Sequence, residues 1–320
     1  MSIEIRYSDA NRATIFERGA ELKSLHLTPT NPPDTGGDWR REILWQGDPT
    51  YWGRTSPLLF PMVGALKGDE TTIGTRKVNI PKHGFCRDAD FIMSQTASNE
   101  VVFTKTADEE TYAMFPFRWT LRVHYRILAG RIKMTYIVTN NETKREMPYC
   151  IGAHPAFNIP FGNKFEDDYD TFGNYKIIFD KEENTQAVKF DIANGHFDPR
   201  LPSKKLNGNV LRLKHTDYLD DCLYYPELNS NSLLITRDGA SGVRVTWENY
   251  TGVAFWTPMP PNDDTMLVDD LPPPADFLCV EPWCGSADWF DSDGIFANKR
   301  GIEKLQPSET KRYSVTIGIE

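Results

Sequence analysis

Apolar and polar residues alternate along much of the chain, which is the two-residue period of a half-buried β-strand. The alternation is clearest in segments 121–127, 132–138 and 313–319. Apolar residues at helical spacing are nearly absent, and there is no short-period repeat of the propeller or solenoid kind. The pattern therefore predicts an all-β protein, a large antiparallel β-sandwich made of many short strands.

Glycine, proline and aspartate mark the connections between the predicted strands. Residues 28–38 contain too many prolines and glycines for a regular element, so we expect a loop there. Segments 233–235 and 243–247 are apolar runs on either side of Asp238-Gly239. This arrangement predicts a β-hairpin that turns at the Asp-Gly dipeptide.

Composition narrows the class of protein. The 320 residues are 39% hydrophobic and 25% charged, which is usual for a globular protein. The net charge is -9 with scattered Lys and Arg, so we expect no nucleic-acid partner, because such a surface needs a basic patch. Neither an apolar run long enough for a transmembrane helix nor a signal peptide is evident, so no membrane association is expected.

The five cysteines are an odd number in a chain without an evident signal peptide. This indicates reduced thiols and a cytoplasmic location. Their spacing fits no zinc motif, so no metal site is expected.

Three prolines hold the backbone of segment 147–161, which follows a clear strand pattern and contains one histidine, His154. Pro155 favours an extended backbone at His154. A rigid loop that presents one imidazole is typical of acid–base chemistry. Taken alone, the segment is equally compatible with a buried histidine that is hydrogen-bonded to a backbone carbonyl.

Glu281 comes at the end of the apolar strand predicted over 277–280 and precedes Pro282. Partial desolvation there should raise the pKa of its carboxyl and make it a better base near neutral pH. The alternative is an ion-paired glutamate at a strand end, which is the commoner role for a single carboxylate.

Further polar candidates stand on glycine- and proline-containing loops. Arg54 lies among aromatic residues and prolines, where a guanidinium is a good fork donor for hydroxyls or phosphate. His83 and Arg87 flank Gly84, which lets the backbone turn closely, and Asp221 precedes an apolar run. With the histidine and glutamate above, this set matches general acid–base chemistry on a small polar molecule.

These residues carry a family resemblance. The sequence resembles the aldose 1-epimerase (galactose mutarotase-like) superfamily, and most closely its LacX-like branch. The matching segments occur in the family's order and span nearly the whole chain: 19–25, 54–61, 83–88, 152–157, 220–223 and 280–285. The resemblance implies one galactose mutarotase-like supersandwich domain over residues 1–320, with a sugar cleft on a concave face.

The resemblance also implies an isomerase of carbohydrate metabolism that interconverts the α and β anomers of a hexose without a cofactor. By position, Glu281 would remove the proton of the anomeric hydroxyl while His154 protonates the ring oxygen. We expect the nearby carboxylates to hold up the pKa of His154. The sugar-binding residues would be His83, Arg54 and Asp221, with Arg87 as a further candidate. Trp256 or Trp283 could stack on the sugar, although core packing is the expected role of both.

The segment before the first histidine reads Ile80-Pro81-Lys82, where the mutarotase branch is rich in asparagine. This departure resembles the LacX-like and hexose-6-phosphate epimerase branches. A hexose-6-phosphate 1-epimerase is therefore a second hypothesis, supported by Arg54 and Arg87 and opposed by the acidic net charge. A third is a non-catalytic carbohydrate-binding or sensing protein, which would not need an acid–base pair. The sequence leaves the sugar open, and also whether the protein is a monomer or a homodimer.

Overall fold

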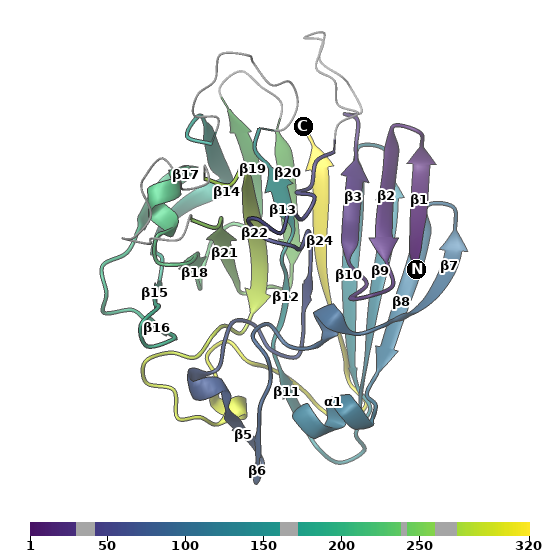
Figure 1. The fold of residues 1–320 in the computed structure, drawn as a ribbon, viewed down its shortest axis with the longest axis vertical. Helices are drawn as coiled ribbons and strands as arrows, with labels where there is room; N and C mark the ends of the chain where they lie inside the picture. The colour runs from purple at the N-terminus through teal and green to yellow at the C-terminus, as the bar shows by residue number, and fades with distance from the viewer. Residues whose placement is uncertain (30–41, 161–171, 238–241, 260–273) are drawn as a thin grey trace.

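The computed structural model describes residues 1–29, 42–160, 172–237, 242–259 and 274–320. In this part of the chain nearly all regular structure is antiparallel β-sheet, as Figure 1 shows. The only α-helix within these ranges is α1 (Glu109–Met114). The predicted all-β class is therefore confirmed. None of the described helices is long and apolar enough to cross a membrane.

The largest sheet has nine strands in the order β17-β14-β19-β20-β24-β10-β9-β8-β7. Their bounds are β7 (Ile92–Ala97), β8 (Glu100–Thr106), β9 (Trp119–Leu128), β10 (Arg131–Asn140), β14 (Tyr175–Gln186), β17 (Lys205–Arg212), β19 (Ser232–Arg237), β20 (Val243–Glu248) and β24 (Thr310–Ile319). The three segments with the clearest alternation form β9, β10 and β24, and their apolar positions are buried. The predicted hairpin arms pair as β19 and β20, with Leu233 opposite Val245.

The second large sheet has six strands. It has the order β18-β21-β22-β12-β4, and β13 also pairs with β22. The bounds are β4 (Leu58–Leu59), β12 (Ile151–Ala153), β13 (Ala156–Asn158), β18 (Leu223–Tyr225), β21 (Gly252–Trp256) and β22 (Phe277–Cys284). All eight residues of β22 are buried. One apolar cluster contains side chains of both large sheets, as a sandwich requires, and Phe179 of β14 meets Phe255 of β21 at 6.0 Å between ring centroids.

The remaining strands form small sheets around this sandwich. They are β1 (Ser2–Ser8), β2 (Asn11–Phe16) and β3 (Leu22–His26), then the pairs β5 (Thr71–Ile73) with β6 (Arg76–Val78), β11 (Met147–Tyr149) with β23 (Glu303–Leu305), and β15 (Lys189–Asp191) with β16 (His196–Asp198). The three-stranded sheet packs against β8 and β9 (Figure 1). Most of the loop predicted at 28–38 and the predicted turn at 238–239 lie outside the described residues.

Candidate active site

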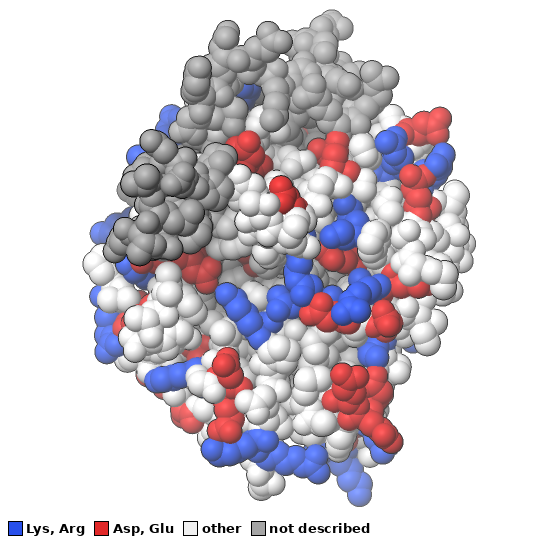
Figure 2. All heavy atoms as spheres, in the orientation of Figure 1, with Lys and Arg blue, Asp and Glu red and all other residues white. Residues whose placement is uncertain are grey.

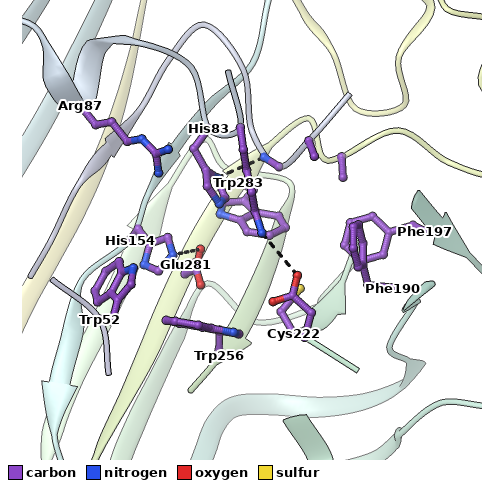
Figure 3. A pocket seen from close by; sticks show the side chains of 15 residues that line it. Trp52, His83, Arg87, His154, Phe190, Phe197, Cys222, Trp256, Glu281 and Trp283 are labelled. Carbon is purple, nitrogen blue, oxygen red and sulfur yellow. Dashed lines mark hydrogen bonds and ion pairs between the residues drawn. The ribbon is translucent and has the colours of Figure 1, made fainter. Parts of the chain in front are cut away.

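An open pocket of about 810 Å³, counted out to its mouth, lies at one face of the six-stranded sheet (Figure 3). Five of the six site residues proposed from the sequence line it: His83, Arg87, His154, Asp221 and Glu281. They come from segments nearly 200 residues apart along the chain, and β22 and the end of β12 bring them together. Arg54 is not among the described residues that line the pocket.

Glu281 and His154 form a buried pair at the floor of the pocket. Glu281 lies inside β22, opposite Ala254 of β21, and not at a strand end as the sequence suggested, because β22 continues to Cys284. The Nε2 atom of His154 lies 3.1 Å from Oε2 of Glu281 (Figure 3). That contact lacks hydrogen-bond alignment, so Oε2 has no hydrogen-bond partner among the described residues. Only 1% of Glu281 and 6% of His154 is exposed.

Burial shifts the pKa values of both members of the pair toward their neutral forms. Burial raises the pKa of Glu281 well above its usual value, and the charge of Asp221 acts in the same direction. The pKa of His154 is lowered to about 3, chiefly by burial, and repulsion by Arg87 and Lys82 acts in the same direction. The expectation that carboxylates hold up the pKa of His154 is therefore wrong, because desolvation outweighs them. At rest the proton of the pair belongs to the Glu281 carboxyl.

Aromatic side chains fix the imidazole of His154. The ring of Trp52 stacks on it with centroids 4.8 Å apart and an interplanar angle of 23°. The ring of Trp256 meets its edge at 6.0 Å. Trp256 and Trp283 both line the pocket, and Trp283 also packs on Tyr224 at 5.1 Å. The two tryptophans thus combine the core-packing role expected from the sequence with a place in the pocket wall.

His83 is held in one tautomer. The backbone N–H of Gly64 donates to its Nδ1 atom at 3.2 Å, and burial lowers the pKa of His83 well below 6.5. The neutral ring must therefore carry its proton on Nε2 and can donate to a ligand hydroxyl. His83 has φ +66°, and a Cβ on Gly84 would lie 2.2 Å from the carbonyl oxygen of Phe60. The sequence interpretation of Gly84 as a close turn is confirmed.

The two arginines differ in their position relative to the pocket. Nη2 of Arg54 lies 3.0 Å and 3.1 Å from the two carboxylate oxygens of Asp88. The Arg87 guanidinium lies at the pocket, as Figure 3 shows, and its buried Nε has no hydrogen-bond partner among the described residues. Burial lowers the pKa of Arg87, and the charge of Arg54 acts in the same direction. Nε of Arg87 also lies 3.7 Å from Oδ2 of Asp88, so both arginines contact that carboxylate, and of the two Arg87 is the one that lines the pocket.

Segment 19–25 supports both arginine loops. Oε1 of Glu21 accepts the backbone N–H groups of Thr55 at 2.8 Å and Ser56 at 3.0 Å. A Cβ on Gly19 would lie 2.5 Å from the carbonyl oxygen of Arg87. This explains why Gly and Glu stand in a segment that is far from the pocket in sequence.

Lys82 is a pocket residue to which sequence reasoning gave no role. Its Nζ lies 3.7 Å from Oδ2 of Asp221, which has φ +77°. Figure 2 shows a band of Lys and Arg side chains across the middle of the face viewed in Figure 1, interspersed with acidic ones. The pocket lining itself contains two basic residues, Lys82 and Arg87, and two acidic ones, Asp221 and Glu281. The signal in the sequence that could have identified Lys82 as a pocket residue is its position directly before His83.

Phe190, Phe197 and Cys222 also line the pocket and were not predicted. Cys279 lies behind the acid–base pair, and one donor atom each of His154, Cys279 and Glu281 fall within 4.8 Å of one another. Burial raises the pKa of the Cys279 thiol well above its usual value. Metal ligation needs the thiolate, so these three side chains are poorly prepared to hold a cation.

Fold and site together define an antiparallel β-sandwich with one buried carboxyl–imidazole pair in an open pocket. Residues 1–293 match the model of the aldose 1-epimerase family, and the chain belongs to that family. It is 30% identical over 309 residues to the plasmid and chromosomal LacX proteins of Lactococcus lactis subsp. lactis, covering 93% of this chain and 95% of each relative.

Solved structures agree. The fold is similar to a galactose mutarotase related enzyme from Lactobacillus acidophilus, with a TM-score of 0.84, 26% identity and coverage of 100% of this chain and 97% of that one. A galactose mutarotase-like protein from Lactobacillus casei has a TM-score of 0.82 at 26% identity, with both chains covered fully. The predicted family and sandwich class are confirmed by these matches.

Proposed function

We propose that this protein is an aldose 1-epimerase, which interconverts the α and β anomers of a hexose by opening and closing the sugar ring. The observation that carries the proposal is the 3.1 Å contact between Nε2 of His154 and Oε2 of Glu281 at the floor of the pocket. Membership of the family supports an epimerase acting on a sugar. The reaction needs one proton acceptor and one proton donor, and no cofactor is required.

In the proposed mechanism the resting pair first exchanges its proton. A bound sugar that donates a hydroxyl hydrogen bond to Glu281 favours the carboxylate, and the proton moves to Nε2 of His154. The Glu281 carboxylate then takes the anomeric proton while the imidazolium protonates the ring oxygen, and the bond between C1 and that oxygen breaks. The products are an open-chain aldehyde, a neutral carboxyl and a neutral imidazole.

The protonation state after ring opening is the same as that of the empty site. Rotation about the C1–C2 bond then presents the other face of the aldehyde. His154 takes the proton of the attacking hydroxyl as Glu281 protonates the carbonyl oxygen, which closes the ring as the other anomer. Ring closure forms the Glu281 carboxylate and the His154 imidazolium again, and the pKa shifts of the empty site disfavour both charged forms. The bound substrate must therefore supply the free energy that stabilises this charged pair.

The other pocket residues bind and orient the sugar in this proposal. Nε2–H of His83 donates to a hydroxyl, and the carboxylate of Asp221 accepts from another. Arg87 is a direct ligand, whereas Arg54 acts through Asp88. We place the reaction in one domain of residues 1–320 in the cytoplasm. The five cysteines all carry free thiols, as a cytoplasmic location requires.

A hexose 6-phosphate is a second candidate substrate. Arg87 favours it, because its buried Nε has no hydrogen-bond partner among the described residues and phosphate is a preferred partner of guanidinium. Lys82 adds a second cation to the pocket lining.

The test is polarimetry or NMR saturation transfer with glucose, galactose and glucose 6-phosphate, on the wild type and on Glu281→Gln. Mutarotation of at least one sugar by the wild type and its loss in the variant would support the proposal. Sugar binding by the wild type without acceleration of any anomer exchange would refute it and leave the non-catalytic carbohydrate-binding role.

A further inference from the structure

The indole N–H of Trp283 is a buried donor to which the proposed mechanism gives no role. Trp283 lines the pocket with only 3% of its surface exposed, and its Nε1 has no hydrogen-bond partner among the described residues. Its ring lies beside that of His83, with centroids 6.4 Å apart (Figure 3). A buried donor without an acceptor destabilises a fold, so its presence in a pocket points to a partner that forms there.

The strand places this N–H beside the carboxyl of Glu281. The two residues stand two positions apart in β22, so their side chains lie on the same face of the sheet. Burial has the largest effect on the pKa of Glu281 and raises it, whereas the indole N–H lowers it, as a donor to a carboxylate does. The contact lacks hydrogen-bond alignment, and both Nε1 of Trp283 and Oε2 of Glu281 are without a hydrogen-bond partner among the described residues. An unpaired donor thus lies next to an unpaired acceptor.

Neighbouring strands hold the indole in this orientation. Gly252 of β21 and Gly152 of β12 lie opposite Trp283 on its two sides. A Cβ on Gly152 would lie 2.7 Å from Cδ1 of Trp283, the ring atom bonded to Nε1, so only glycine leaves room for the indole there. The ring of Tyr224 packs on the indole at 5.1 Å between centroids, and the N–H of Thr251 donates to the Trp283 carbonyl at 3.1 Å. The donor is therefore preorganised and needs little rearrangement to reach the carboxylate.

The charge of Glu281 changes during the proposed reaction. A hydrogen bond from an N–H to a carboxylate is shorter and about twice as strong as one to a neutral carboxyl. The indole N–H of Trp283 therefore contributes most once the proton of the pair has moved from Glu281 to His154. That is the state in which the carboxylate takes the anomeric proton.

The other groups around Glu281 give the carboxylate little support. Burial and, after it, the charge of Asp221 disfavour the charged form, whereas the charge of Lys82 favours it. The side chain of Lys82 is 53% exposed and pairs with Asp221, so solvent and salt weaken its effect. The thiols of Cys222 and Cys279 remain neutral, because burial raises their pKa values well above the usual one. The indole N–H adds a donor inside the pocket that solvent does not screen.

We propose that Trp283 is a positioning residue of the reaction, whose indole N–H donates to the Glu281 carboxylate as its charge forms. The hydrogen bond favours the state in which Glu281 is ionised and His154 carries the proton for the ring oxygen. This inference rests on the proposed function. The indole gives up no proton and forms no bond to the sugar, so it acts through Glu281 alone.

The experiment compares Trp283→Phe with the wild type by polarimetry, on the sugar that the wild type turns over fastest. The variant keeps a ring against Tyr224 and removes the N–H. The matched control is Trp119→Phe in β9, because Trp119 is also buried with an unpartnered Nε1 among the described residues and does not line the pocket. In Trp283→Phe kcat should fall by about tenfold to a hundredfold with KM within about twofold, because a hydrogen bond to a charged group is lost.

The pH profile provides a readout that a packing role would not change. At its alkaline limb the pair loses its last proton, which comes from Glu281. Without the indole donor the carboxylate is less favoured, so the alkaline limb of kcat/KM should move to higher pH in Trp283→Phe while the plateau falls. Trp119→Phe should change neither the limb nor the plateau.

Proton–nitrogen NMR of the indole groups tests the contact without turnover. The Trp283 resonance is identified by its absence from the spectrum of Trp283→Phe. In the free wild type its indole proton should shift downfield as pH rises through the pKa of Glu281, because the new carboxylate strengthens the hydrogen bond. The shift should vanish in Glu281→Gln, and the Trp119 resonance should not move.

The outcomes separate this inference from the proposed function. An unchanged kcat in Trp283→Phe, or a fall in kcat without movement of the alkaline limb, would refute the positioning role and leave the epimerase. A rise in KM alone would show that the N–H binds the sugar and would overturn the inference. If no sugar is turned over but the Trp283 resonance titrates with Glu281, the contact stands and the epimerase fails. A Trp283 resonance that does not respond to Glu281 refutes the contact in either case.

Discussion

Glu281→Gln should have opposite effects on turnover and on stability. Glutamine keeps the shape of the neutral carboxyl that the buried site favours, but it cannot accept the anomeric proton. General base catalysis contributes about 10²–10⁴ in rate, so kcat should fall by about that factor. Sugar binding should survive, because an amide still fills the site.

The stability effect follows from the raised pKa of Glu281. Between the unfolded pKa near 4.5 and the higher folded pKa, the folded chain keeps a proton that the unfolded chain has released. The stability that this proton contributes is complete below the unfolded pKa and is lost as pH rises through the folded pKa. Within that interval the wild type loses about 1.4 kcal/mol of unfolding free energy per pH unit relative to a side chain that does not titrate.

Urea unfolding of the wild type and Glu281→Gln at a series of pH values above about 4.5 measures this difference. The unfolding free energy of the variant should rise relative to that of the wild type as pH rises. The contribution of His154 is the same in both proteins and cancels in the difference. Glu110→Gln, which removes an exposed carboxylate on α1, is the control for lost charge. A stability difference that does not change with pH would show that Glu281 is ionised in the fold. Full activity of Glu281→Gln would transfer the base role to another carboxylate, with Asp221 the first suspect.

Three further substitutions extend the test. His154→Asn should lower kcat about as much as Glu281→Gln, and kinetics of the double variant should show little further loss, because the two groups act as a unit; additive losses would contradict this. Arg54→Ala should raise KM more than it lowers kcat, since it loses interactions that the ground and transition states share, and a fall in kcat alone would show the role is misassigned. Gly84→Ala should lower the unfolding free energy in urea by more than about 2 kcal/mol, because its Cβ would meet the Phe60 carbonyl at 2.2 Å at φ +75°; unchanged stability would mean that this turn relaxes.

The strands could be predicted from the sequence because each shows a local two-residue alternation of apolar and polar residues. In β9 the apolar residues Leu121, Val123 and Tyr125 face the core, so the alternation in sequence reproduces the burial in the fold. The sequence predicts a strand over 277–280 with Glu281 at its end, because the apolar run stops there and Pro282 follows. In the structure Pro282 lies within β22 opposite Val253, and the strand continues beyond it.

Less of the pocket could be predicted from the sequence, because its properties depend on segments that the fold brings together. The low pKa of His154 comes from burial beside Trp52, a residue about 100 positions earlier in the sequence, and no local pattern reports that burial. Phe190 and Phe197 belong to a short hairpin whose sequence has no feature to distinguish a pocket wall from a solvent edge. The candidate residues converged in one pocket because the resemblance supplied their positions, not because spacing alone implied it.

Because Lys82 and Asp221 form an ion pair at the pocket, the relative affinity for a neutral and a phosphorylated sugar should depend on ionic strength. Its charges stand 3.7 Å apart on partly exposed side chains, where such a pair contributes only about 0–1 kcal/mol and is weakened by salt. A neutral sugar whose hydroxyl donates a hydrogen bond to Asp221 competes with Lys82 for that carboxylate, so added salt makes its binding less costly by weakening the ion pair. The phosphate of a phosphorylated sugar interacts directly with the charges of Lys82 and Arg87, so the same salt weakens its binding. The two candidate substrates are thus opposed in their response to salt.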